Sequence, residues 1–375
     1  MKMDYWQKRA LKLEKKTNDG AKKLDSAVSL AYKQAQSYLT QQINKLFMRT
    51  KQKTGLTEDE VIKMLNQDVP KSELVELQRL AKQIKDKDLQ ADAKKRLTGL
   101  ALKARITRLE DLKAKSYLVA KQVADVQLTK QTDFYIDVIH DSYKEATAES
   151  VIRQAQENAK KGVVIEVWNK KDYEFKQLST KYTKNILETH WKGSNYSKRL
   201  WGDTEALAKR LEELFTVESM TGMSQFEMAK AIASEFDRSI GVAKRLIRTE
   251  ANYMANQAKL KSMRDNGVKY YMIVAILDLR TSTICRRADH KVYLVGEAKV
   301  GVNLPPLHVY CRSTVAFYSK RLLNIPRIAL DPISGKTMQI RGATTYNEWM
   351  DKLKAMYSDE EIKRTKKTID ESLNI

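Results

Sequence analysis

A chain of 375 residues, 42% hydrophobic and 31% charged, is long enough for two or three domains with hydrophobic cores. Its two cysteines exclude a disulfide-stabilised small scaffold, and no apolar run approaches the length of a membrane span. The 69 Lys and Arg against 47 Asp and Glu give a net charge of +22, which favours nucleic acid or an acidic protein surface as a partner. A helical protein with many solvated lysines is the alternative explanation.

The first segment, residues 1–53, is expected to be a basic helical arm with 13 Lys and Arg against 4 Asp and Glu. Its apolar residues recur with a period near 3.6, which predicts one buried stripe on a long helix, at Leu24, Val28, Ala31, Ala35, Leu39, Ile43 and Phe47. The stripe suits a bundle helix, although the lysines of the arm could also face a partner. The candidates for DNA contact are Lys8, Arg9, Lys15, Lys16, Lys22, Lys23, Arg49 and Lys51. The segment lacks the apolar core of a signal peptide, so synthesis in the cytoplasm is expected.

More helices are expected downstream, because the chain contains only 5 Pro and 13 Gly. Four helix starts have the spacing of a capping box, which satisfies free amides at a helix N-terminus: Thr57 with Glu60, Ser224 with Glu227, Thr345 with Glu348, and Ser358 with Glu361. A β-branched stretch at residues 163–167 predicts a short strand or an extended loop. Ser239 is expected to cap a helix that runs to about Asp265.

The C-terminal third differs in pattern. A continuous apolar run at residues 268–277 predicts a strand buried on both faces, and residues 291–295 and 313–319 predict two more strands. Residues 331–343 are expected to form a loop. We therefore expect an α+β fold that is predominantly α-helical, with a long-helix N-terminal region followed by a small α+β domain with a short sheet. The expected segments are a basic α-helical domain (1–155), a helical connecting region (156–238), an α+β domain (239–325) and a tail with short helices (326–375).

Both cysteines and two of the four histidines fall within residues 278–313. The spacing C-x4-H and H-x2-C of Cys285, His290, His308 and Cys311 provides a complete tetrahedral ligand set for zinc. Cys285, beside two arginines, could instead form a catalytic pair with His308. A Cys285–Cys311 disulfide is a third alternative, and a pair of buried thiols is the fourth and simplest. The residues by themselves leave all four open.

Polar residues near this segment are expected to be architectural. Asp278 ends the buried run, and a bidentate pair with Arg280 could hold the loop that continues through Thr281. The Pro305–Pro306 pair stiffens the approach to His308.

The preceding helix carries a second polar group. Arg248 and Asn252 lie one turn apart on it, with Glu250 between them in sequence. These side chains could form a buried network between the helix and the loop, or a nucleic-acid face together with Arg245.

Taken together, these stretches resemble the phage head-morphogenesis or minor capsid protein family, the Mu F-like domain. The resemblance covers about residues 180–355 and rests on "LIRTEANYMANQAKL", "GVKYYMIVAILDLRTSTICRRADHKVY" and "GVNLPPLHVYCRSTV". The flanking "YSKRLWGDTEALAKRLEEL" and "TTYNEWMDKL" resemble the version found in phages of Gram-positive bacteria. His290 stands where the family more often has glycine, which weakens a four-ligand zinc site. The residues that carry the structural motif are Arg248, Glu250, Asp278, Arg280, Thr281, Cys285, Pro306, His308, Cys311 and Arg312.

The resemblance implies a non-enzymatic minor head protein of the virion, with a structural role in head assembly and in DNA packaging or ejection. The implied partners are the portal protein, capsid and scaffold proteins and, through the charge of +22, double-stranded DNA without sequence preference, but no membrane. The implied location is the interior of the phage head, after synthesis in the host cytoplasm. No cofactor is expected, zinc being the one candidate. The alternatives are a packaged nucleic-acid-processing enzyme, with Cys285, His308 and Arg312 in its site, and a stand-alone DNA-binding protein.

Overall fold

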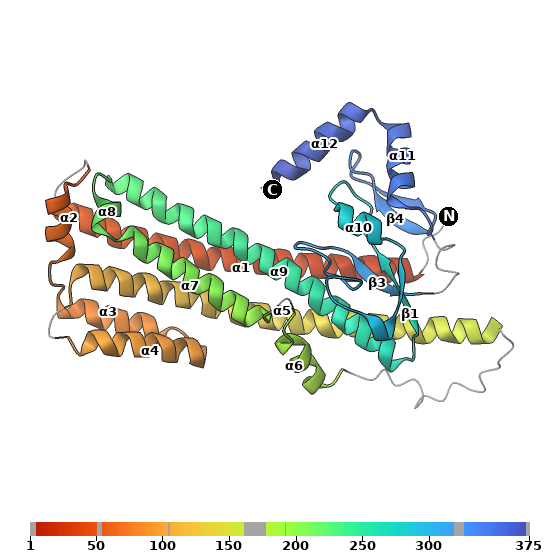
Figure 1. The fold of residues 1–375 in the computed structure, drawn as a ribbon, viewed down its shortest axis with the longest axis horizontal. Helices are drawn as coiled ribbons and strands as arrows, with labels where there is room; N and C mark the ends of the chain where they lie inside the picture. The colour runs from red at the N-terminus through yellow and green to blue at the C-terminus, as the bar shows by residue number, and fades with distance from the viewer. Residues whose placement is uncertain are drawn as a thin grey trace. The chain divides into compact units, whose positions relative to one another are not determined.

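The computed structural model describes residues 5–50, 55–103, 106–160, 178–191, 193–318 and 326–372. These residues are mostly helical, with two small antiparallel sheets toward the C-terminus (Figure 1). The structure thus confirms the α+β fold in which long helices dominate. Among the described helices, none is both long enough and apolar enough to cross a membrane. The stretch at residues 163–167 lies outside the described residues.

The chain divides into two compact units, each assembled from separated stretches. Unit 1 comprises the described parts of Met1–Gly20, Tyr135–Trp191 and Arg248–Ile375, and unit 2 those of Ala21–Phe134 and Lys192–Ile247. Three long helices contribute residues to both units: α1 (Tyr5–Thr50), α5 (Arg108–Lys160) and α9 (Gln225–Asp265). The four segments expected from the sequence divide the chain consecutively and stay a prediction.

Unit 2 is helical throughout its described part. Besides its shares of α1, α5 and α9 it contains α2 (Glu58–Leu65), α3 (Lys71–Lys82), α4 (Lys87–Ala101), α7 (Tyr196–Leu214) and α8 (Val217–Met220). The predicted stripe of α1 lies in its core, where every member is buried except the half-buried Ala31. The 3.6-residue period therefore identified the packed face of this helix correctly.

Two lysines are buried in unit 2 and are paired there. Lys115 is 2% exposed, and its Nζ lies 2.8 Å from Asp111 and 2.5 Å from Glu73. Lys121 is 1% exposed and pairs with Asp92 at 2.8 Å and with Glu205. Burying an ammonium group is costly unless carboxylates compensate it, so these pairs fix how α5 packs among its neighbours.

One helix boundary was predicted wrongly. Ser239 does not begin a helix, because α9 runs without a break from Gln225 to Asp265. The Ser239 hydroxyl accepts a hydrogen bond from Arg210 at 3.2 Å. Phe236 and Ile240 pack in the core of unit 2 on either side of it, and this packing keeps the segment helical. The four predicted capping boxes are present, at Thr57, Ser224, Thr345 and Ser358.

Unit 1 contains a three-stranded antiparallel sheet in the order β2-β1-β3, built from β1 (Tyr270–Val274), β2 (Val292–Leu294) and β3 (Thr314–Phe317). The three strands confirm the predicted ones, although each is shorter than expected. Leu260 and Met263 of α9 pack with Tyr271 and Ile273 of β1 and so form the core beneath the sheet. The unit also contains α6 (Thr180–Glu188), α10 (Thr283–Ala288), the short 3-10 helix η1 (Val295–Glu297), α11 (Tyr346–Met356) and α12 (Asp359–Ser372).

The expected loop at residues 331–343 is in part a strand. β4 (Arg327–Leu330) pairs with β5 (Thr337–Ile340) in an antiparallel hairpin. Asp331 builds the turn by accepting hydrogen bonds from the amides of Ile333 and Ser334. β5 is only four residues long, and Ile340 contributes to a core around Trp349, so tertiary contact rather than local pattern stabilises the strand.

A close backbone approach in unit 2 requires glycine. The amide of Gly222, whose φ is 78°, donates to the Leu56 carbonyl at 2.9 Å. A Cβ on Gly55 would lie 2.4 Å from the Gly222 carbonyl oxygen. The segment before α2 therefore packs directly on the turn after α8.

Replacing Gly55 by alanine is expected to lower the free energy of unfolding by about 1–3 kcal/mol, because the backbone at Gly222 must move to make room. Gly99→Ala is the matched control, since Gly99 lies within α4 and nothing lies within 4 Å of an added Cβ. That change is expected to raise stability by about 0.5–1 kcal/mol. Urea denaturation followed by circular dichroism measures both, and equal effects would contradict the close approach.

Candidate functional site

The polar face of α9 holds the backbone that leads into β3. Asn256 accepts a hydrogen bond from the Val315 amide at 3.1 Å, and Asn252 donates to the Ser313 carbonyl at 2.9 Å. Lys259 donates to the Thr314 hydroxyl at 2.7 Å. The helix-to-loop network expected at Asn252 therefore exists. Asn256 was missed, although its place one turn beyond Asn252 was a usable signal.

The other predicted residues of α9 have separate environments. Glu250 is 1% exposed and accepts a hydrogen bond from the Trp191 indole at 2.9 Å. The Trp191 ring stacks on Tyr253 with 5.0 Å between ring centroids. Arg248 is half-buried on the same helix. Thr249, which the sequence reasoning did not single out, accepts a hydrogen bond from the Tyr310 amide at 3.1 Å.

An ion pair between the buried Asp278 and the partly exposed Arg312 follows β1. Both oxygens of Asp278 accept hydrogen bonds from the Arg312 guanidinium, whose Nη2 lies 2.7 Å from Oδ1. Asp278 also accepts from the Thr281 hydroxyl at 3.1 Å and from the Arg280 amide at 2.9 Å. The bidentate partner is thus Arg312, not the guanidinium of Arg280 as expected. Arg280 contributes its backbone instead, because its side chain is exposed.

Asp278 stays ionised despite its burial. Burial alone raises the pKa of its carboxyl, but the hydrogen bonds and charge of Arg312, with help from Thr281, outweigh burial and hold the pKa below its ordinary value. A carboxylate of this kind stabilises the fold above its unfolded-state pKa and loses that effect as the pH falls through its folded-state pKa.

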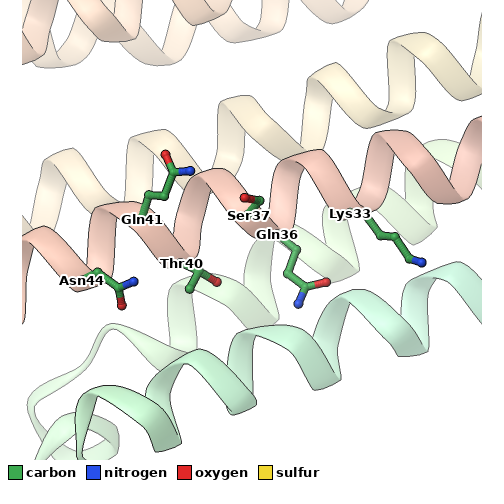
Figure 2. A pocket seen from close by; sticks show the side chains of 6 residues that line it. All are labelled: Lys33, Gln36, Ser37, Thr40, Gln41 and Asn44. Carbon is green, nitrogen blue, oxygen red and sulfur yellow. The ribbon is translucent and has the colours of Figure 1, made fainter.

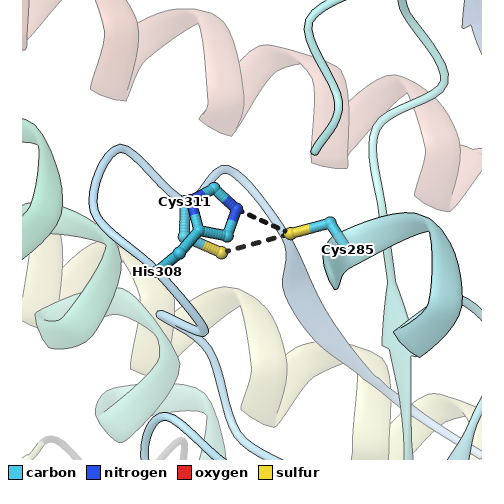
Figure 3. Close-up of side chains that lie close together, drawn as sticks. All are labelled: Cys285, His308 and Cys311. Atoms are coloured by element: carbon cyan, nitrogen blue, oxygen red, sulfur yellow. Dashed lines mark hydrogen bonds between the residues drawn. The ribbon is translucent and has the colours of Figure 1, made fainter. Parts of the chain in front are cut away.

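Two thiols and one imidazole lie close together, those of Cys285, Cys311 and His308 (Figure 3). Cys285 lies in the first turn of α10, where its amide donates to the hydroxyl of the N-cap residue Ser282. Cys311 ends a turn in which its amide donates to the His308 carbonyl at 3.2 Å. Cys285 Sγ lies 3.0 Å from His308 Nε2 and 3.7 Å from Cys311 Sγ. Pro306, joined to Pro305 by a cis peptide bond, precedes this turn.

The orientation of the imidazole is set by its own backbone. Nδ1 of His308 lies 2.6 Å from the Val309 carbonyl oxygen, which can only accept, so Nδ1 carries the proton. Nε2 then faces the sulfur of Cys285 and the hydroxyl of Ser282, which lies 2.7 Å away.

The pKa values of the two thiols are shifted in opposite directions. The hydrogen bond from Cys311, and further ones involving His308 and Ser282, outweigh burial and lower the pKa of Cys285 to about 4. The thiolate at Cys285 and burial together raise the pKa of Cys311. One proton is therefore shared by the pair. Cys285 is 3% exposed and Cys311 2%, so the thiolate is shielded from solvent.

The structure brings together three of the four zinc candidates. His290 is not in the cluster: its φ is 63°, and its Nδ1 lies 3.8 Å from Asp289. The sulfurs of Cys285 and Cys311 are also not bonded, since a disulfide has a sulfur separation of about 2.05 Å.

The candidate DNA-contact residues are described in part. Lys22 and Lys23 are exposed on α1, whereas Lys16 forms an ion pair with Asp141 at 2.5 Å. The side chains of Lys8, Arg9, Lys15 and Arg49 lie outside what the structure describes. Lys51 lies outside the described residues.

A shallow open pocket lies along α1 in unit 2 (Figure 2). Asn44, at one end of it, accepts a hydrogen bond from Gln225 at 2.8 Å. The pocket is lined by Lys33, Gln36, Ser37, Thr40, Gln41 and Asn44. These residues include one ammonium group but no carboxylate, thiol or imidazole, so the pocket offers no acid–base pair.

Residues 209–316 match the family model described as phage Mu protein F like protein. The matched range contains the polar face of α9, the Asp278–Arg312 pair and the thiol–imidazole cluster. This part of the chain is therefore similar to that phage protein family. Comparisons with the curated proteins and with the solved structures found no match.

Replacing Arg312 by alanine is expected to destabilise the protein by about 2–4 kcal/mol, because it leaves the buried Asp278 carboxylate without its partner. The loss should shrink as the pH falls toward the range in which Asp278 of the variant takes up a proton. Arg280→Ala is the control, since the Arg280 amide that binds Asp278 is retained. Thermal unfolding at several pH values tests this, and a pH-independent loss would contradict the assigned role of the carboxylate.

Proposed function

We propose that the chain is a structural minor head protein of a phage, associated with the portal and the procapsid and acting in head assembly and in DNA packaging or ejection. The observation that carries the proposal is the match of residues 209–316 to the phage Mu protein F like family. The motifs that flank this range favour a phage of Gram-positive bacteria. The proposed partners are the portal protein and the capsid and scaffold proteins, inside the head, after synthesis in the host cytoplasm.

The geometry of the candidate site favours a structural role over an enzymatic one. A nucleophilic thiolate must reach its substrate, but Cys285 is only 3% exposed. Arg312, which a nucleic-acid-processing site would use to bind a phosphate, is engaged by Asp278. Asp278, Thr281 and Asn256 all bind neighbouring backbone or side chains. These interactions stabilise a domain, and we propose that the protein is not an enzyme.

Non-specific contact with double-stranded DNA is the second part of the proposal. A net charge of +22 inside a DNA-filled head favours binding to phosphates, which is driven by the release of counterions. Among the described arm residues, the exposed Lys22 and Lys23 are the best placed to contribute.

Purified procapsids and virions of the phage that encodes the chain are expected to contain it in few copies, cross-linkable to the portal protein. Quantitative mass spectrometry of gradient-purified particles measures this, with the major capsid protein as the internal standard. Absence of the chain from both kinds of particle would refute the head assignment.

The double substitution Lys22→Glu, Lys23→Glu is expected to weaken DNA binding and to reduce the slope of log K against log salt by about 2, one unit for each lost phosphate contact. Lys366→Glu, Lys367→Glu changes the charge equally on two exposed residues of α12 and is the matched control. Fluorescence anisotropy with duplex DNA of mixed sequence provides the measurement. Equal slopes for the two variants would argue against contact through the arm, and salt-independent binding against DNA contact altogether.

A further inference from the structure

The cluster at Cys285 has the donor chemistry of a metal site. Two sulfurs and one imidazole nitrogen lie within 4.8 Å of one another, two of them on buried residues. Thiolate and imidazole ligands together suit Zn²⁺, whereas Mg²⁺ and Ca²⁺ prefer oxygen ligands. Of the described residues, these three form the one group of His, Cys and acidic side chains close enough to share an ion.

The distances agree with this chemistry. In a tetrahedral site with Zn–S bonds of about 2.3 Å, two thiolates lie about 3.8 Å apart, and the sulfurs of Cys285 and Cys311 are 3.7 Å apart. The same geometry separates a sulfur from an imidazole nitrogen by about 3.5 Å. His308 Nε2 lies 3.0 Å from Cys285, so its ring would withdraw by about half an ångström to admit the ion.

The surroundings orient the donors toward one point (Figure 3). The Val309 carbonyl accepts a hydrogen bond from Nδ1 of His308, so Nε2 is the nitrogen that faces Cys285, an arrangement usual for a histidine that binds a metal. Tyr310, between His308 and Cys311, has a φ of 60°, which is costly for a bulky residue. The Thr249 hydroxyl binds the Tyr310 amide and helps to hold this turn, which brings the two donor residues together.

Ordinary packing of two buried thiols explains fewer features of this arrangement than a metal site does. The cysteines do lie in a small apolar cluster with Ala275 and Leu307. Such packing needs neither an imidazole nitrogen 3.0 Å from a sulfur nor a strained turn between the other two donors. An apolar shell is also what surrounds many metal sites.

We propose that Cys285, Cys311 and His308 bind a zinc ion that joins the first turn of α10 to the turn at residues 308–311. A water molecule would complete the coordination. The ion acts as a structural cross-link in unit 1. This inference rests on the geometry of these residues and does not depend on the proposed role in the phage head.

Titration of the full chain tests the inference. The protein is purified under reducing conditions, stripped with a chelator, and titrated with Zn²⁺ in competition with a chromophoric chelator. We expect one tightly bound zinc per chain and a melting temperature that rises with free zinc, since the ion binds the folded state. Cobalt in place of zinc should give a thiolate-to-metal charge-transfer band and the visible bands of tetrahedral coordination.

Substitutions identify the ligands. Cys285→Ser, Cys311→Ser and His308→Ala are each expected to weaken zinc binding by more than about 100-fold, beyond the loss typical of outer-sphere changes. His290→Asn is the control, because asparagine tolerates a positive φ and His290 lies outside the cluster; its affinity should equal that of the wild type.

Two results would overturn the proposal. One is a reduced wild-type chain that binds zinc no more tightly than the Cys285→Ser variant. The other is a reduced wild-type chain whose melting temperature does not change with free zinc, since an ion that binds the folded state must stabilise it. If the variants fail to fold, the cobalt spectrum of the wild type decides, and absence of the charge-transfer band rejects the site.

Discussion

The pairing of Asp278 with Arg312 determines the geometry of the whole candidate site. A carboxylate that is 5% exposed must be compensated, and the guanidinium, the Thr281 hydroxyl and the Arg280 amide together do so. This pair attaches the segment before β3 to the loop after β1. Because Cys311 is adjacent to Arg312, and Cys285 lies one turn of α10 beyond that loop, the same constraint places the two thiols face to face.

The helix α9 supports the other side of that segment. Four of its side chains, spaced about one turn apart, bind groups of Tyr310, Ser313, Thr314 and Val315: Thr249, Asn252, Asn256 and Lys259. The backbone that carries His308 and Cys311 is therefore fixed from two directions. Donors held in this way are pre-organised, and their burial suits a permanent structural connection better than turnover of a substrate.

The arrangement fits the assembly role that we propose for the chain, because the polar side chains of the site bind one another or neighbouring backbone. The family match covers the polar face of α9, the Asp278–Arg312 pair and the thiol–imidazole cluster. Motif residues such as Asp278, Thr281 and Arg312 then have a physical explanation, since each satisfies a partner that would otherwise be buried without one.

The sequence by itself determined the local features of this protein: the buried stripe of α1, the four capping boxes, the three strands of the main sheet and the motif that resembles the family. These follow from periodicity, from side chains that reach their own backbone, and from β-branched composition, all of which act within a few residues. The tertiary structure alone decided that Arg312 rather than Arg280 pairs with Asp278, that Ser239 lies inside a continuous helix, and that His290 lies apart from the other three donors. Each of these depends on contacts between residues distant in the chain or on backbone conformation, which local spacing does not encode.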